Sequence, residues 1–428
     1  MKVAFYTLGC KVNQYETQAL EQLLCGRGHT LVPFEESADA YIINTCTVTA
    51  VSDKKSRQII RRTRKTAPDA IIAVCGCYPQ THPQDMEGLS IDLVSGTGDR
   101  QGFVELLERT WQERQPITAL DNAFERRVFE VLPAGGLEGR TRAMLKVEDG
   151  CVNFCSYCII PYARGPIRSL PLDKAREQAA LLASEGYREL VLTGIEISSW
   201  GHEWKDGPTL IDLIEAVCHA APDCRVRLGS LEPRTITEEF CARAAKLPNL
   251  CPHFHLSMQS GCDATLKRMN RKYDTARYYE SVTLLRRYFH APAITTDLIV
   301  GFPGETEEEF AQTLDFIQKC AFSAMHIFPY SKRPDTPAAK MPDQVLKAVK
   351  EERAHRASQV AQAMEQAYLA QFVGQTVEVL FEQQRDGAWH GYTTRYTEVA
   401  VESPEVLHNQ LRNVDISGVD GGCLRGKV

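Results

Sequence analysis

Residues 150–165 read GCVNFCSYCIIPYARG, and this stretch decides the fold. Three cysteines, Cys151, Cys155 and Cys158, stand within eight residues in the spacing C-x3-C-x2-C. Thiolates bind iron well, and this spacing lets one loop wrap a corner of an iron–sulfur cube. Three protein ligands leave one iron of a four-iron cluster open to a substrate or cofactor. A zinc site is the alternative, although no second Cys or His pair follows soon after the loop.

The segment before this loop, RAMLKV, is typical of a buried strand. Strand and helix patterns then alternate to about residue 330, in six units. Such units predict a parallel α/β barrel that is partial rather than closed from eight units. The cysteine loop follows the first strand, at the carboxyl end of the barrel, where the active sites of such barrels lie.

Residues 1–113 also alternate strand and helix patterns, which predicts a parallel sheet covered by helices. A cysteine stands just past each of the apolar strands KVAFYTL, DAYIINT and AIIAVCG, namely Cys10, Cys46 and Cys77. Because the loops after parallel strands share one edge of a sheet, these thiols can converge on one ligand. Cys75 competes with Cys77, but it falls within the third strand and is expected to pack against a helix.

The remaining segments suggest a linker, a helix and a second kind of β structure. Residues 114–140 have broken periodicity and a Gly-Gly pair, which predicts a linker. Residues 343–371 contain no Gly or Pro and predict a long helix. Short β-rich runs separated by turns predict a small antiparallel β-barrel at the C-terminal end. We expect three domains, at residues 1–113, 137–371 and 372–428.

The composition is that of an ordinary globular chain of 428 residues, with 43% hydrophobic and 24% charged residues. The formal net charge is −6, so no global field attracts nucleic acid and any RNA contact must be local. The start lacks a signal-peptide pattern, and no apolar run approaches the roughly 20 residues that span a bilayer. We expect a cytoplasmic protein that uses no membrane. Fifteen cysteines then favour metal or cluster ligation over disulfides.

The cysteine loop, with Tyr157 before its last cysteine and a βα barrel after it, resembles the radical S-adenosylmethionine superfamily. In that superfamily S-adenosylmethionine chelates the open iron of a 4Fe-4S cluster. An electron from the cluster cleaves the cofactor to methionine and a 5′-deoxyadenosyl radical. The resemblance makes Cys151, Cys155 and Cys158 the catalytic cluster ligands. It implies contacts to S-adenosylmethionine at the ends of later strands, from Gly194, Glu196, Ser230, Glu232 and Gln259.

Two three-cysteine sets in one chain resemble the methylthiotransferases. The segments TLGCKVNQYET, NTCTVT, GCYPQ and FPYSKRPDTPAAKMP are most similar to the MtaB branch, which converts N6-threonylcarbamoyladenosine next to the tRNA anticodon (position 37) to its 2-methylthio derivative. The resemblance implies that a second, auxiliary 4Fe-4S cluster is held by Cys10, Cys46 and Cys77. It also implies that a sulfur on this cluster is methylated and that the radical removes hydrogen from C2 of the adenine. The implied partners are tRNA, an electron donor such as flavodoxin or ferredoxin, and a sulfur donor.

One segment carries a local basic signal. Residues 53–65, DKKSRQIIRRTRK, hold seven basic residues and one acidic residue directly after the Cys46 loop. A helix of this charge density can neutralise several phosphates, whereas a solvated helix face is the alternative. The C-terminal segment resembles a TRAM domain, an RNA-binding barrel, yet its five Lys/Arg and eight Asp/Glu give it a net charge of −3. The candidate RNA-binding residues are Arg57, Arg61, Arg62 and Arg64.

Other interpretations stay open at this point. A methylthiotransferase of this kind could act on isopentenyl-adenosine of tRNA or on an aspartate of a ribosomal protein. An iron–sulfur RNA-binding or redox-sensing protein without turnover would carry the same cysteines, and a zinc-binding structural protein is a third class. The sequence leaves the oligomeric state open.

Overall fold

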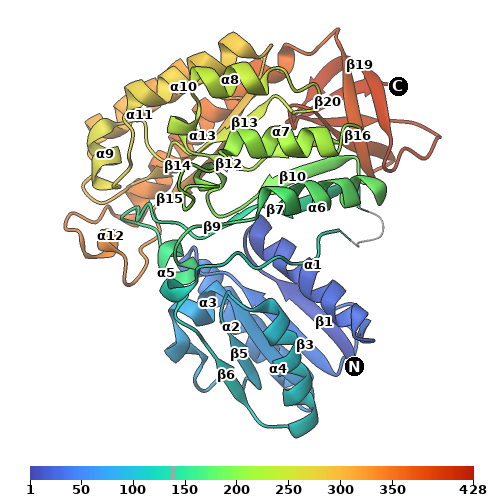
Figure 1. The fold of residues 1–428 in the computed structure, drawn as a ribbon. Helices are drawn as coiled ribbons and strands as arrows, with labels where there is room; N and C mark the ends of the chain where they lie inside the picture. The colour runs from blue at the N-terminus through green and yellow to red at the C-terminus, as the bar shows by residue number, and fades with distance from the viewer. Residues whose placement is uncertain (136–139) are drawn as a thin grey trace.

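The computed structural model describes residues 1–135 and 140–428. The N-terminal part, in blue, lies below the central part, and the C-terminal barrel, in red, packs against the side of the central part (Figure 1). The expected start of the second domain, residue 137, lies outside the described residues, as do residues 136–139 of the expected linker at 114–140.

The N-terminal part is a six-stranded sheet in the order β2-β1-β3-β4-β5-β6, with every neighbouring pair parallel. Successive residues of β3 face opposite cores, so that Ile42 packs under α1 and α4 while Ile43 packs under α2 and α3. This two-sided burial explains the unbroken apolar runs of the strands. The last strand lies beyond residue 113, where the domain was expected to end. The strands are β1 (Lys2–Thr7), β2 (Thr30–Leu31), β3 (Ala40–Thr45), β4 (Ile71–Gly76), β5 (Leu93–Ser95) and β6 (Ile117–Ala119), and the helices are α1 (Lys11–Gly26), α2 (Ala50–Thr66), α3 (Cys77–Thr81) and α4 (Arg100–Glu113).

The central part is an open arc of parallel strands, which confirms the predicted partial barrel of six βα units. It consists of the sheets β11-β10-β7 and β12-β13-β14-β15, and only Gly229 separates β11 from β12. A short antiparallel pair, β8 (Glu148–Asp149) and β9 (Arg168–Ser169), brackets the cysteine loop. The parallel strands are β7 (Arg142–Lys146), β10 (Glu189–Thr193), β11 (Arg225–Leu228), β12 (Ser230–Leu231), β13 (His253–Leu256), β14 (Ala293–Val300) and β15 (Ala324–Pro329).

Helices cover the outside of this arc, and their apolar residues form the largest core of the molecule with those of the strands. The long helix expected over 343–371 is present as α13 and begins four residues later, after Asp343 adopts a positive φ of 56°. The helices are α5 (Ile160–Arg164), α6 (Leu172–Ser184), α7 (Leu210–Ala220), α8 (Glu238–Ala244), α9 (Asp263–Arg268), α10 (Thr275–Tyr288), α11 (Glu307–Cys320), α12 (Pro337–Lys340) and α13 (Lys347–Ala370).

The C-terminal part is a closed barrel in the order β16-β17-β18-β20-β19. Four of its pairings are antiparallel, as expected, but β18 and β20 pair in parallel. The difference arises because β19 and β20 form a hairpin whose free edge meets β18 running in the same direction. Tyr368 and Leu369 at the end of α13 insert into the barrel core and fix it to the central part. The strands are β16 (Thr376–Arg385), β17 (Ala388–Thr393), β18 (Glu398–Val401), β19 (Leu411–Asp420) and β20 (Cys423–Lys427).

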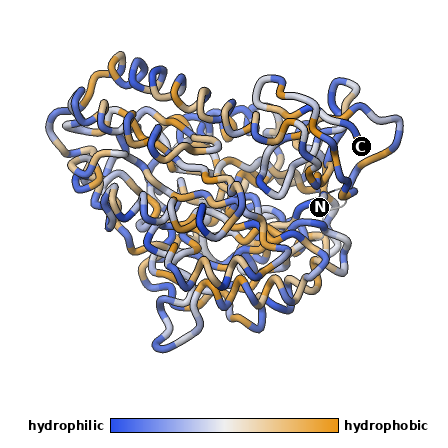
Figure 2. Tube along the Cα trace, turned by 90° about the horizontal axis from the view of Figure 1, so that it is seen from above, coloured by the Kyte–Doolittle hydropathy of each residue, from blue (hydrophilic) through white to orange (hydrophobic). Residues whose placement is uncertain are grey.

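Apolar and polar residues are interspersed along the trace (Figure 2). Among the described residues, no helix combines the length and the apolar character needed to cross a membrane.

Candidate active site

The barrel triad, Cys151, Cys155 and Cys158, lies in the loop after β8, at the carboxyl end of β7. The backbone N–H of Cys151 donates to Gly165 O at 3.0 Å, which closes the loop, and the N–H of Cys158 donates to Cys155 O at 2.9 Å. The three thiols lie close enough to interact electrostatically. Burial raises the pKa of the Cys158 thiol to about 12, and a bound cation would favour the thiolate form of this side chain. The structure therefore brings the three predicted ligands together in a site that suits a metal cluster.

Arg271 stands beside this triad and was not among the predicted residues. Its Nη1 donates to the Sγ of Cys155 at 3.2 Å, and its Nη2 donates to Ser257 O at 3.1 Å. Its Nε donates to the hydroxyl of Tyr273 at 3.0 Å. A guanidinium fixed in this way offsets the negative charge of thiolates. No sequence signal pointed to it, because it lies 116 residues from its partner.

Two buried carboxyl groups form a cradle next to the barrel triad. The N–H of Glu196 donates to Glu148 Oε2 at 2.7 Å, and a Cβ at Gly194 would come within 2.8 Å of the same oxygen. The Oε1 atoms of Glu148 and Glu196 are buried without a hydrogen-bond partner among the described residues. Burial raises the pKa of Glu196 to about 7 and that of Glu148 well above 4.5. These unpartnered oxygens suit a ligand ammonium such as the amino group of S-adenosylmethionine, so the cradle fits that cofactor.

The other predicted cofactor residues lie along the same rim. Ser230 is exposed on β12, whereas Glu232 is buried and accepts a hydrogen bond from Arg234 Nε at 2.9 Å. Gln259 has a φ of +69°, and its N–H donates to Asp297 O at 2.9 Å. Their contacts to S-adenosylmethionine stay predictions.

The N-terminal triad, Cys10, Cys46 and Cys77, lies at one edge of the parallel sheet. Electrostatic interactions join all three thiols, which shows that the loops after β1, β3 and β4 converge. Gly9 has a φ of +115°, and a Cβ there would lie 2.9 Å from the Cβ of Cys46. Gly76 has a φ of +99°, and a Cβ there would clash with the backbone of Thr45 at the end of β3. Glycine is required at both places, and a converged set of three thiols fits an iron–sulfur cluster.

The competing thiol, Cys75, is fully buried and packs in the core under α1 and α4, as expected for a residue within β4.

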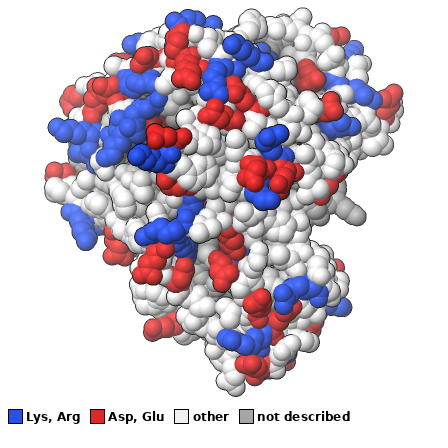
Figure 3. All heavy atoms as spheres, in the orientation of Figure 1, with Lys and Arg blue, Asp and Glu red and all other residues white. Residues whose placement is uncertain are grey.

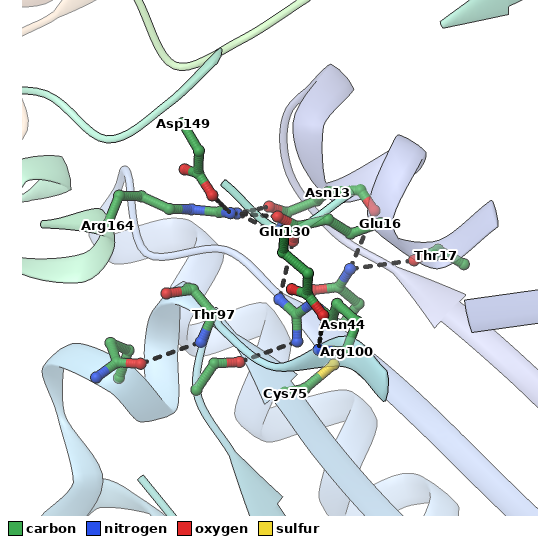
Figure 4. Close-up of polar contacts among 12 residues, drawn as sticks. Asn13, Glu16, Thr17, Asn44, Cys75, Thr97, Arg100, Glu130, Asp149 and Arg164 are labelled. Atoms are coloured by element: carbon green, nitrogen blue, oxygen red, sulfur yellow. Dashed lines mark hydrogen bonds and ion pairs between the residues drawn. The ribbon is translucent and has the colours of Figure 1, made fainter. Parts of the chain in front are cut away.

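A buried charge network joins the N-terminal part to the loop of the barrel triad, and Figure 4 shows Glu16, Arg100 and Arg164 within it. Glu16 on α1 accepts hydrogen bonds from Arg100 Nη2 and Lys146 Nζ, both at 2.8 Å. Arg164 is the last residue of α5, the helix that begins two residues after Cys158. Its Nη2 donates to the same carboxylate at 3.2 Å. Burial alone raises the pKa of Glu16, but the three cations outweigh it and hold the pKa well below 4.5. The loop of the barrel triad is thus anchored to the first helix of the N-terminal part.

A cavity of about 660 Å³ opens between Cys158 and the segment that follows Cys46, and we call it the inter-triad cavity. Val48 and Val51, just after Cys46, line one side, and Cys158 lines another. Gln259 and Phe328, from the ends of barrel strands, complete the walls together with the start of α13. Its volume is that of a typical small-molecule site. A larger cavity of about 920 Å³, on the N-terminal part, contains none of the six triad cysteines.

The four arginines of α2 fall into two groups. Arg57 donates to the hydroxyl of Tyr78, and Arg64 donates to the carboxylate of Asp92, so both hold the local fold. Arg61 and Arg62 are exposed and available to a partner. Elsewhere Lys and Arg are mixed with Asp and Glu over the face seen in Figure 3. Contact of α2 with RNA stays a prediction.

Comparisons with known proteins agree with this site. The family model described as "Radical SAM superfamily" matches residues 145–317, and the model described as "Uncharacterized protein family UPF0004" matches residues 2–96. The partial barrel with its open three-cysteine loop therefore defines a radical S-adenosylmethionine enzyme. The chain is 41% identical to the "Threonylcarbamoyladenosine tRNA methylthiotransferase MtaB" of Bacillus subtilis (strain 168), over 97% of this chain and 93% of that relative. The chain belongs to the radical S-adenosylmethionine tRNA methylthiotransferase family, as its motifs indicated.

Two further relatives bear on the substrate and the fold. A "tRNA-2-methylthio-N(6)-dimethylallyladenosine synthase" of Acetivibrio thermocellus (strain ATCC 27405) is 33% identical, over 99% of this chain and 90% of that relative. The radical S-adenosylmethionine methyltransferase TsrM from Kitasatospora setae superposes with a TM-score of 0.60 at 17% identity, over 85% of this chain and 89% of that chain. A second TsrM structure, with a TM-score of 0.57, has a 4Fe-4S cluster bound. The family implies S-adenosylmethionine and 4Fe-4S clusters as cofactors, which the two triads and the carboxyl cradle suit.

Proposed function

We propose that this chain methylthiolates N6-threonylcarbamoyladenosine at position 37 of tRNA, next to the anticodon. The observation that supports the proposal is a cavity lined by Cys158 of the barrel triad and by Val48 and Val51, which follow Cys46 of the N-terminal triad. Sulfur insertion needs a radical centre and a sulfur-bearing centre within reach of one substrate. Relatives named for threonylcarbamoyladenosine are 41, 37 and 36% identical to this chain. Relatives named for dimethylallyladenosine reach 33 and 32%, so that substrate is the second candidate.

The residues divide the work between the parts of the chain. Cys151, Cys155 and Cys158 would hold the cluster that binds S-adenosylmethionine, and this pair supplies, when bound, the radical that removes hydrogen from C2 of the adenine. Glu148 and Glu196 would orient the cofactor by accepting hydrogen bonds from its amino group, since an Oε1 of each is buried without a partner among the described residues. Arg271 would offset the charge of the thiolates through its contact with Cys155.

The N-terminal triad would hold the auxiliary cluster, whose role is to carry the sulfur that is methylated and transferred. On this proposal residues 1–113 would bind the auxiliary cluster that carries the sulfur, and residues 137–371 would bind the cluster and cofactor that generate the radical. Residues 372–428 would contact tRNA. An electron donor of the flavodoxin or ferredoxin class and a sulfur donor are then required, and a tRNA substrate implies a reaction in the cytoplasm.

Anaerobic reconstitution with iron counting tests the cofactor assignment. We expect about eight iron atoms per chain for two cubane clusters. Cys155→Ala and Cys46→Ala should each keep about four, but only Cys46→Ala should still release 5′-deoxyadenosine. Cys25→Ala, at an exposed thiol outside both triads, is the matched control and should keep the full count.

Mass spectrometry of tRNA nucleosides tests the substrate. A strain without this gene should lose the 2-methylthio derivative of threonylcarbamoyladenosine and keep that of isopentenyl-adenosine. The reverse pattern would establish the second candidate instead.

A further inference from the structure

Part of the lining of the inter-triad cavity is apolar or aromatic. Phe328 and Val51 line it with exposed fractions of 50% and 74%, although their side chains are apolar. Tyr157 and Tyr330 line it as well, and both rings pack against the buried ring of Phe302 behind the wall, at 6.4 and 5.4 Å between centroids. Such a surface suits a planar ring system such as a purine, which buries its faces against apolar and aromatic side chains.

One lysine of this cavity is held in place beside Tyr330. The stem of Lys350 packs on Gly301, where a Cβ would lie 2.4 Å from its Cγ. Its Nζ lies 4.9 Å from the centroid of the Tyr330 ring and donates to Tyr330 O at 3.0 Å. An ammonium has three N–H donors, so this contact leaves two of them for a ligand.

The other charged residues of the cavity are already paired. Lys347 lies 3.4 Å from Glu351, and Asp297 lies 3.4 Å from His255. Among the described residues Lys350 has no carboxylate within ion-pair distance. Burial lowers the pKa of Lys350, so an anionic ligand would satisfy a charge that the fold leaves uncompensated.

We propose that the inter-triad cavity receives the target adenine and that Lys350 binds the carboxylate of its N6-threonylcarbamoyl group. The inference rests on the proposed function and adds the residue that selects the substrate. A dimethylallyl group is a neutral hydrocarbon and offers nothing to an ammonium. A site built for a charged hydrogen bond rejects an analogue that lacks the charge, because its own polar group is then left unpaired.

Equilibrium binding tests the proposal without turnover. The reconstituted enzyme, without reductant, is titrated with three tRNAs that differ only at position 37, which carries threonylcarbamoyladenosine, its methyl ester or isopentenyl-adenosine. The wild type should bind the acid about 10- to 100-fold more tightly than the ester, the range of one charge-assisted hydrogen bond. Lys350→Met should remove this preference and leave the affinity for the ester unchanged, and Lys350→Arg should restore part of it.

Lys332→Met is the matched control, because Lys332 is exposed and does not line the cavity. It should affect all three tRNAs alike, since a lysine that contacts phosphates does not distinguish base modifications. Equal wild-type affinity for acid and ester would overturn the inference, as would a Lys350→Met variant that keeps the preference. Tighter wild-type binding of isopentenyl-adenosine tRNA than of both threonylcarbamoyl forms would instead overturn the proposed substrate.

Discussion

Replacing Glu16 with Gln should destabilise the protein by about 3–5 kcal/mol, the cost of leaving a buried charge without its partner. Arg100 and Arg164 have 0% of their side chains exposed and Glu16 has 1%, so water cannot replace the lost carboxylate. Glutamine has the same shape and leaves no cavity, which isolates the electrostatic contribution. After the change, the carboxylate of Asp149 pairs with Lys146, Arg164 and Arg168, at 2.9, 3.5 and 3.2 Å, while Arg100 loses its carboxylate partner and keeps its hydrogen bond to Gly96 O.

Urea unfolding at neutral pH measures this loss, followed separately for the N-terminal and central parts because a chain of several parts need not unfold in one step. Glu177→Gln is the control, since its ion pair with Lys174 is exposed and should leave the free energy of unfolding nearly unchanged. A loss below about 1 kcal/mol for Glu16→Gln would refute the view that the network holds the two parts together.

The same variant predicts a change in acid sensitivity. The pKa of Glu16 is depressed in the folded state, so its stabilisation is complete above the ordinary value of 4.5 and is lost as the pH falls towards the folded pKa. The difference in unfolding free energy between wild type and Glu16→Gln should therefore shrink on acidification below pH 4.5. A difference that stays constant down to the acid transition would contradict the assignment.

Three other perturbations follow from the structure. Arg61→Gln combined with Arg62→Gln should weaken tRNA binding and make the plot of log affinity against log salt shallower by about two; an unchanged slope excludes a role for α2. Trp200→Ala should lower the free energy of unfolding by about 3–5 kcal/mol, because this fully buried ring donates from Nε1 to Leu170 O at 3.0 Å, and wild-type stability would show that the core can close around the gap. Arg271→Met should keep the iron count but lower the reduction potential of the barrel cluster in a spectroelectrochemical titration, and an unchanged potential would mean that its charge is not felt there.

Much of the fold could be predicted because its signals are local. Apolar runs typical of strands alternate with helical patterns along the chain. Because each helix carries the chain back across the sheet, this alternation predicts parallel strands. The parallel pairing of β18 with β20 could not be predicted, because it depends on where a hairpin folds back in space. The later start of α13 has a similar cause, since Asp343 adopts a left-handed backbone that the helical composition around it does not indicate.

The residues of the candidate site also fall into those with a local sequence signal and those that depend on distant partners. The six triad cysteines could be singled out from the sequence, three by their C-x3-C-x2-C spacing and three because each follows the end of a predicted strand. Arg271 and Glu16 could not, because each acts through a partner more than 100 residues away. Glu148 lies three residues before Cys151, yet its role depends on Glu196 and Gly194 at the end of another strand.

Arg164 has one more consequence. Arg164 is only six residues from Cys158 in the sequence, and its guanidinium binds Asn13 and Glu16 of the N-terminal part. The short segment between Cys158 and Arg164 therefore limits the distance between the barrel triad and the N-terminal triad. The N-terminal part can be exchanged for that of a distant homologue only if the homologue has an acidic residue at the position of Glu16, and the central part only if the homologue has a cation at the position of Arg164. Whether a chimera of this enzyme folds should therefore depend on the contact between Glu16 and Arg164, even where each part is stable by itself.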